Sequence, residues 1–350
     1  ALYHAYNLLA LEEKEAQIEH LYEMLEGQVA VLSAEKLNPA EALEVLDALK
    51  ASAMYREDQY SYLLYPDRQL GGFLEKNRIR PEQIEGKQLS SALLEKDVQG
   101  DYHFKGQFRN AKDLKAALEK LALEDQAEAV DAEAQFWFEL YEQSFVHREF
   151  TGRSGTFYGY EGLGSIYWHM VSKLLLAVQE NLRAAKQNGA SADILGRLID
   201  HYYEIRAGIG ANKSPQLYGA FPFDAYSHTP STAGAQQPGM TGQVKEDVLN
   251  RWAELGLEVR AGQLHLDPFF MAEDEFLKEG RSFKYVDAAG QWQSLDLEAG
   301  EMAFSYCSVP FIYRKAQESK LRIEFFGTAV EESSELQINE KWSRSLFDRH

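Results

Sequence analysis

The spacing of apolar residues predicts helices in the first two-thirds of the chain. Between Leu2 and Leu32 they recur at steps of three and four, which predicts one long helix or two shorter ones, already helical at Ala1. Asn38 followed by Pro39 predicts the start of a further helix that runs to about Ala53. Similar patterns predict helices over residues 110–123, 128–146, 164–187, 190–207 and 243–255, the last ending at Gly256.

Beyond residue 260 the pattern changes to short apolar runs separated by glycines. These runs predict strands over residues 264–267, 283–286, 303–306 and 321–326. Helices followed by strands are the order expected of a mainly α protein with a β appendage, rather than of a βαβ sheet. We therefore expect a helical domain at residues 1–258 and a small C-terminal antiparallel β domain at residues 259–350.

Composition and charge narrow the classes of partner. The chain has 350 residues, of which 45% are hydrophobic, enough for a substantial core. Its 55 acidic and 36 basic residues give a net charge of −19, which repels nucleic-acid phosphates and anionic lipid headgroups. We expect no nucleic-acid partner and no membrane partner.

The single cysteine, Cys307, indicates neither an internal disulfide nor a cysteine zinc site. A reducing, cytoplasmic setting is therefore expected, with no metal and no organic cofactor.

Two glycine-led helix starts are candidates for binding chemistry. Residues 159–169 form a glycine-rich aromatic segment that leads into a helix, where backbone N–H groups and His169 could bind an anion or sugar hydroxyls. Thr241 and Gly242 precede a later helix, where Thr241 could bind a ligand. The simpler alternatives are a buried His169 among packed aromatics and an ordinary helix cap at Thr241.

Between these helix starts lies a long connection, residues 208–239, rich in glycine and proline, and long connections in compact domains are often functional. Its aromatic stretch, residues 218–228, suits a sugar, because aromatic rings cover C–H faces while polar groups address hydroxyls. The candidate substrate-binding residues in and around these segments are Tyr160, Glu161, Tyr167, Asp224, His228 and Gln237.

Two further clusters are weaker candidates. Arg56 and Asp58 lie in a charged aromatic segment and could address a sugar or a phosphate. Asp101 and His103 could form an acid–base or metal pair, although no second ligand motif accompanies them. Solvated loop charge explains both clusters as well.

Taken in order, three motifs resemble the C-terminal half of glycoside hydrolase family 94, the cellobiose- and chitobiose-phosphorylase-like enzymes. They are Gly164-x-x-Tyr167-x-His169, Thr241-Gly242 and Leu264-His265-Leu266-Asp267-Pro268, within a resemblance over roughly residues 155–270. The resemblance implies part of an (α/α)6 barrel of the six-hairpin glycosidase type, followed by the β domain. It also implies an inorganic-phosphate site at His169, Thr241 and Gly242, with phosphate as a co-substrate.

The sequence departs from that family at residues 160–163, where the family has an arginine-bearing lead, and at Gln243. Phosphorolysis and inverting hydrolysis of a β-linked di- or oligosaccharide, with the related glycosyl transfer, therefore both stay open. A non-catalytic glycan-binding helical protein is the alternative from another class, and a helical protein with accidental caps is the third.

The resemblance leaves the catalytic residue of this chain unknown. The family's general-acid aspartate would fall at or before Ala1, so we expect it upstream and leave open whether the chain alone is an enzyme. The expected partners are a sugar substrate, the N-terminal remainder of the same protein and, as an open choice, a second copy in a homodimer.

Overall fold

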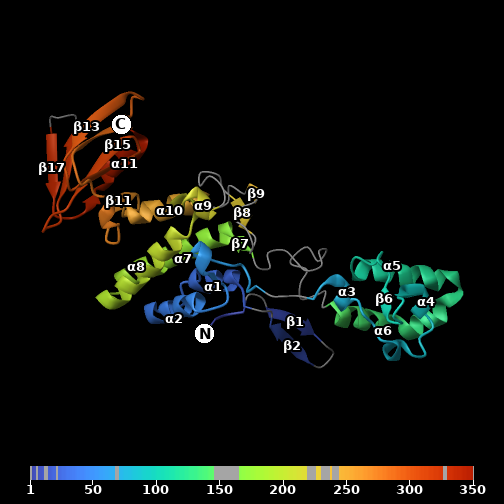
Figure 1. Ribbon diagram of the computed structural model, residues 1–350. Coiled ribbons are helices and arrows are strands. Elements are labelled where there is room, and N and C mark those ends of the chain that lie inside the picture. The colour runs from blue at the N-terminus through green and yellow to red at the C-terminus, as the bar shows by residue number, and fades with distance from the viewer. Residues whose placement is uncertain are drawn as a thin grey trace. The chain divides into compact units, whose positions relative to one another are not determined.

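The computed structural model describes most of the chain (Figure 1). The described residues are 2–4, 7–11, 15–20, 23–67, 71–145, 165–218, 226–229, 237–238, 244–325 and 329–349. They form two compact units: the first contains residues 1–174 and 203–240, and the second contains residues 175–202 and 241–350.

The chain begins with a β-hairpin, so the helix expected from Leu2 onward is wrong. β1 (Asn7–Leu11) pairs antiparallel with β2 (Ala16–His20), and the first helix is α1 (Leu25–Leu32). Residues 16–20 alternate apolar and polar side chains, a strand signal that helical spacing overlaps in so short a window. Tyr3 N donates to Gln28 Oε1 at 2.9 Å, which ties the extended start of the chain to α1.

The next helix confirms the prediction made from its cap. α2 (Pro39–Lys50) starts after Asn38, whose side chain accepts the N–H groups of Ala40 and Glu41, while Glu41 accepts the N–H of Asn38. A short hairpin follows, in which β3 (Tyr55–Arg56) pairs with β4 (Ser61–Tyr62).

Residues 71–145 form a helical module with a hydrophobic core of its own. Its elements are α3 (Phe73–Lys76), α4 (Ser90–Leu93), β5 (Leu94–Lys96), β6 (Tyr102–Phe104), α5 (Ala111–Leu121) and α6 (Ala127–Phe145). α5 starts at Asn110, whose side chain accepts the N–H groups of Lys112 and Asp113, as its sequence predicted.

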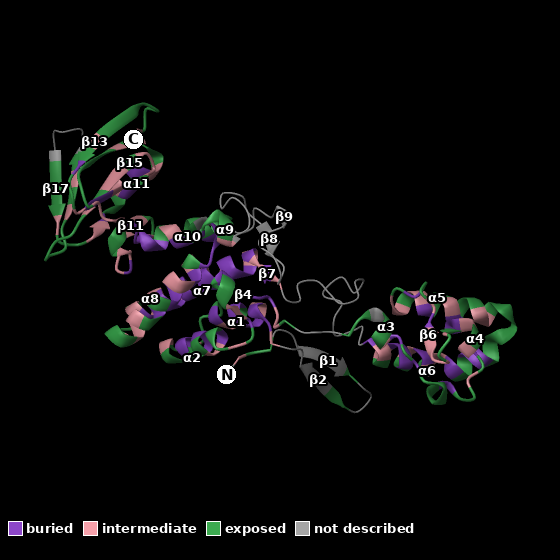
Figure 2. Ribbon diagram, in the orientation of Figure 1, coloured by how far each residue is buried: buried purple, intermediate pink, exposed green. Residues whose placement is uncertain are grey.

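Aromatic rings fill the centre of the helical module. Phe104 of β6 contacts the rings of Trp137 and Tyr141 of α6, with centroids 6.3 and 5.2 Å apart. Leu89, Leu93 and Leu114 are fully buried in the same cluster. Figure 2 shows buried positions alternating with exposed ones along α6, the pattern of a helix with one face in a core.

The predicted helices after residue 164 are confirmed, with slightly later starts. α7 (Trp168–Gln187) follows the short strand β7 (Ile166–Tyr167), and α8 (Ala192–Ala207) follows a turn. α9 (Pro215–Tyr218) leads toward β8 (Tyr226–Thr229) and β9 (Gln237–Pro238), which form a three-stranded sheet with β7.

In the second unit α10 (Val244–Glu254) ends just before Gly256, the residue predicted to stop it. Gly256 has a φ of +71°, and a Cβ there would lie 2.2 Å from the carbonyl carbon of Asp267, so glycine is required.

Antiparallel hairpins follow α10, and each of the four predicted strands is one member of a pair. The strands are β10 (Leu257–Arg260), β11 (Gln263–Leu266), β12 (Arg281–Val286), β13 (Trp292–Leu297), β14 (Glu301–Tyr306), β15 (Val309–Arg314), β16 (Leu321–Phe325), β17 (Ala329–Ser333) and β18 (Gln337–Ile338). The strands pair two by two, β10 with β11, β12 with β13, β14 with β15 and β16 with β17, and β18 adds to β11 as a third strand.

A last helix, α11 (Glu340–Asp348), interrupts the expected all-strand region. The Asn339 side chain caps it by accepting the N–H of Trp342 at 3.0 Å. Ser343 Oγ accepts the N–H of Leu264 and donates to Ile338 O, so α11 is fixed to β11.

The described residues therefore combine helices with small antiparallel sheets in the C-terminal part. The (α/α)6 barrel and the domain boundary near residue 258 stay predictions. Among the described residues no helix combines the length and apolar character needed to cross a membrane.

Candidate functional site

The sheet β7–β8–β9 places three predicted site residues at adjacent register positions. Tyr167 of β7 lies opposite His228 of β8, and His228 lies opposite Gln237 of β9. Opposite residues of paired strands have Cβ atoms about 4.5–5.5 Å apart. The backbone thus brings Tyr167 into one sheet with His228 and Gln237, which follow it by about 60 and 70 positions in sequence.

At the junction of β7 and α7, side chains alternate between core and surface. Ile166 and Trp168 are buried, whereas Tyr167 and His169 are half-buried. Tyr167 Oη lies 3.3 Å from His169 Nδ1, and the two rings meet edge to face at 83°. The buried pair anchors the segment while the half-buried pair holds a hydroxyl and an imidazole together.

A buried lysine, Lys213, contacts this junction through the ring of Trp168. Lys213 is 6% exposed, and its Nζ donates to Gln59 Oε1 at 3.2 Å and lies 4.6 Å from the centroid of the Trp168 ring. Gln59 Nε2 in turn donates to Leu217 O at 2.9 Å. The ammonium therefore contacts both the β3–β4 hairpin and the first residue of α7.

Burial, followed by repulsion from the nearby Arg56, lowers the pKa of Lys213 to about 7, against an opposing effect of Asp58. Arg56 and Asp58 form an ion pair with N–O distances of 2.8 and 2.9 Å. The sequence singled out Arg56 and Asp58 but gave no signal for Lys213.

A close backbone approach fixes the same hairpin against the end of α8. A Cβ on Gly208 would lie 1.9 Å from Tyr60 O, so only glycine fits there. Tyr60 itself has a φ of +50°.

Several predicted site residues lie outside the described residues. They are Tyr160, Glu161, Asp224, Thr241 and Gly242. The backbone of His228 and Gln237 is described, but their side chains are not. Of the predicted phosphate site, His169 is thus the residue that is described, and of the predicted substrate-binding residues Tyr167 is described with its side chain.

The second weak cluster lies in the helical module, where it closes a turn. His103 Nε2 lies 3.0 Å from Asp97 Oδ2, and its Nδ1 contacts Asn77 O. Asp101 is paired with Arg78 instead of His103. Within the described part of the chain, no group of three or more His, Cys, Asp or Glu residues could hold a metal ion.

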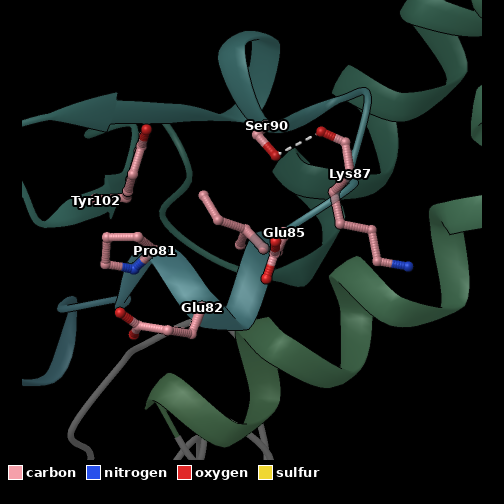
Figure 3. A pocket seen from close by; sticks show the side chains of 7 residues that line it. Pro81, Glu82, Glu85, Lys87, Ser90 and Tyr102 are labelled. Carbon is pink, nitrogen blue, oxygen red and sulfur yellow. Dashed lines mark hydrogen bonds between the residues drawn. The ribbon is translucent and has the colours of Figure 1, made fainter.

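The helical module also carries an open pocket of about 470 Å³ (Figure 3). Pro81, Glu82 and Tyr102 line it, and the Ser90 hydroxyl at its edge donates to Lys87 O at 2.8 Å. None of the predicted site residues borders this pocket.

Comparison with known proteins identifies the helical module. Residues 70–148 match the family described as GH149 phosphorylase insertion domain 2. No curated protein matches the chain. The matched range encloses the separate aromatic core of the module, which runs from Ile79 to Phe145.

The path of the chain agrees with an insertion. Leu64 N donates to Ser165 O at 2.8 Å, so the residues on either side of the matched segment are bonded to each other although they are about 100 positions apart. The chain is therefore related to glycoside phosphorylases. The family 94 details stay a prediction.

Proposed function

We propose that the chain is part of a glycoside phosphorylase that cleaves a β-linked di- or oligosaccharide with inorganic phosphate. The match of residues 70–148 to an insertion domain of phosphorylases carries this proposal. The bond between Leu64 and Ser165 supports it, because it makes the matched segment an insertion in this chain too.

In this proposal α7, α8 and α10 belong to an (α/α)6 barrel whose helix starts surround the substrate. Phosphate binds at His169, Thr241 and Gly242. The sugar is bound by the substrate-binding residues named from the sequence, of which Tyr167, His228 and Gln237 meet in one sheet.

The contact between Tyr167 and His169 assigns a role to each side chain. A Tyr167 hydroxyl that donates to Nδ1 leaves the proton of a neutral imidazole on Nε2. His169 Nε2–H is then a donor for a phosphate oxygen. In the reaction, a general-acid carboxyl group gives its proton to the glycosidic oxygen as the bond from that oxygen to C1 breaks, and a phosphate oxygen bonds to C1 from the opposite face.

The test uses the natural protein and a panel of β-linked di- and oligosaccharides of different sugars, with and without inorganic phosphate. We expect sugar 1-phosphate to form only when phosphate is present. Tyr167→Phe should raise KM for phosphate, because it frees the His169 tautomer, whereas Tyr102→Phe in the module pocket serves as the matched control. Reducing sugar formed equally well without phosphate would show hydrolysis instead, and binding without turnover would favour a glycan-binding protein.

A further inference from the structure

Burying the Lys213 ammonium costs the folded chain free energy. A buried cation loses its hydration, and in a protein interior a lysine is normally found with an acidic partner. The described contacts of its ammonium are the neutral Gln59 amide and the face of Trp168. An apolar side chain would fill the same space without that cost.

The contacts of Lys213 connect three segments that the proposed site uses. Gln59 belongs to the β3–β4 hairpin, Trp168 begins α7, and Leu217 precedes the aromatic stretch 218–228. Trp168 lies between Tyr167 and His169 in sequence, so a shift of its ring moves both neighbours. The attraction of an ammonium to an indole face is stronger when both groups are desolvated, as they are here, so it favours one position of the Trp168 ring.

We propose that Lys213 is a positioning residue for the phosphate site, acting through Trp168 on Tyr167 and His169. This role rests on the proposed function in so far as phosphate binds at His169. Lys213 itself need not touch phosphate.

The same geometry makes the site respond to pH. The charged groups that act on Lys213 are Arg56 and Asp58 of the β3–β4 hairpin, and Arg56 repels the ammonium. Since the pKa of Lys213 is about 7, the ammonium becomes a neutral amine across the neutral range. The cation–π contact with Trp168 is then lost, and we expect His169 to be held less firmly above pH 7.

The first experiment follows Trp168 without any ligand. Near-ultraviolet circular dichroism and tryptophan fluorescence of the natural protein are recorded from pH 5.5 to 9. We expect a transition near pH 7 that is absent in Lys213→Met. Lys186→Met is the matched control, because Lys186 lies over Phe269 at the other end of α7, at 4.1 Å, and the transition should remain. Gln59→Leu should move it to lower pH, because the ammonium loses its acceptor.

The second experiment tests the link to phosphate at pH 6, where Lys213 is charged. We expect Lys213→Met to raise KM for phosphate about tenfold with the sugar KM within twofold, and Lys213→Arg to restore most of the loss. A transition that persists in Lys213→Met, or an unchanged KM for phosphate, would overturn the proposal. A normal optical transition without any phosphate-dependent turnover would instead refute the proposed function and leave Lys213 as the group that positions Trp168.

Discussion

Replacing Lys213 by methionine should remove a pH-dependent destabilisation of the first compact unit. The pKa of Lys213 is lowered by burial and by Arg56 from its ordinary 10.5 to about 7. Between these two values the folded chain binds fewer protons than the unfolded chain. The contribution of Lys213 to the free energy of unfolding therefore rises with pH across this window, and below pH 7 its cost is present in full.

The size of the effect follows from the shift. Each pKa unit corresponds to about 1.4 kcal/mol, so linkage predicts that the free energy of unfolding rises by about 2–3 kcal/mol between pH 6 and pH 9 through this group. Methionine does not titrate. At every pH the substitution lowers the free energy of unfolding by about 1 kcal/mol, because Gln59 Oε1 loses the hydrogen bond that Lys213 Nζ donates. The variant should thus be the more stable protein at pH 6, and its advantage should shrink by about 2–3 kcal/mol at pH 9.

Hydrogen exchange of the α7 amides, followed by mass spectrometry at pH 6 and pH 9, measures this difference in the relevant part of the chain. Lys186→Met, a more exposed lysine of the same helix, should show no such change with pH. A difference between variant and wild type that does not vary with pH, or a variant less stable at pH 6, would refute the reasoning.

Three other substitutions test the packing around the site and in the helical module. Gly208→Ala places a Cβ 1.9 Å from Tyr60 O and should lower the stability of the first unit by at least about 2 kcal/mol, measured by urea unfolding. Glu133→Gln should cost about 2 kcal/mol, because the buried carboxylate accepts N–H groups from Gln88, Leu89 and Trp137; a melting temperature equal to wild type would contradict this. The hydrogen bond to Asp97 raises the pKa of His103, so the His103–Asp97 pair stabilises the module in full below pH 6.5 and less as pH rises through the higher folded pKa. His103→Gln should abolish this trend, measured by hydrogen exchange of the β5–β6 amides.

Local chemistry made much of the fold predictable. Asn38, Asn110 and Gly256 mark helix ends because their side chains, or the lack of one, satisfy backbone groups within a few residues. The N-terminal hairpin was missed because five-residue strands fit both periods, and α11 because its cap, Asn339, follows closely on a strand.

The site was predictable only where its residues are neighbours in sequence. Tyr167 and His169 are two positions apart, so their types and spacing are visible in the sequence alone. Lys213 contacts Gln59 across 154 positions, and no spacing rule links two such residues. The insertion was missed for the same reason, because only the bond between Leu64 and Ser165 shows that the flanking residues meet.

That bond has a consequence for how such a protein changes over generations. Leu64 and Ser165, which flank the helical module in the sequence, are bonded backbone neighbours. One deletion or acquisition of coding DNA between them therefore removes or adds the whole module and leaves two ends that already meet. The free-energy cost of closing a loop grows by only about 0.6 kcal/mol for each doubling of its length. The inserted segment can therefore lengthen or shorten with little effect on the stability of the rest of the chain. We expect length variation among relatives to concentrate between Leu64 and Ser165, while the β7–α7 junction beside it stays constant in length.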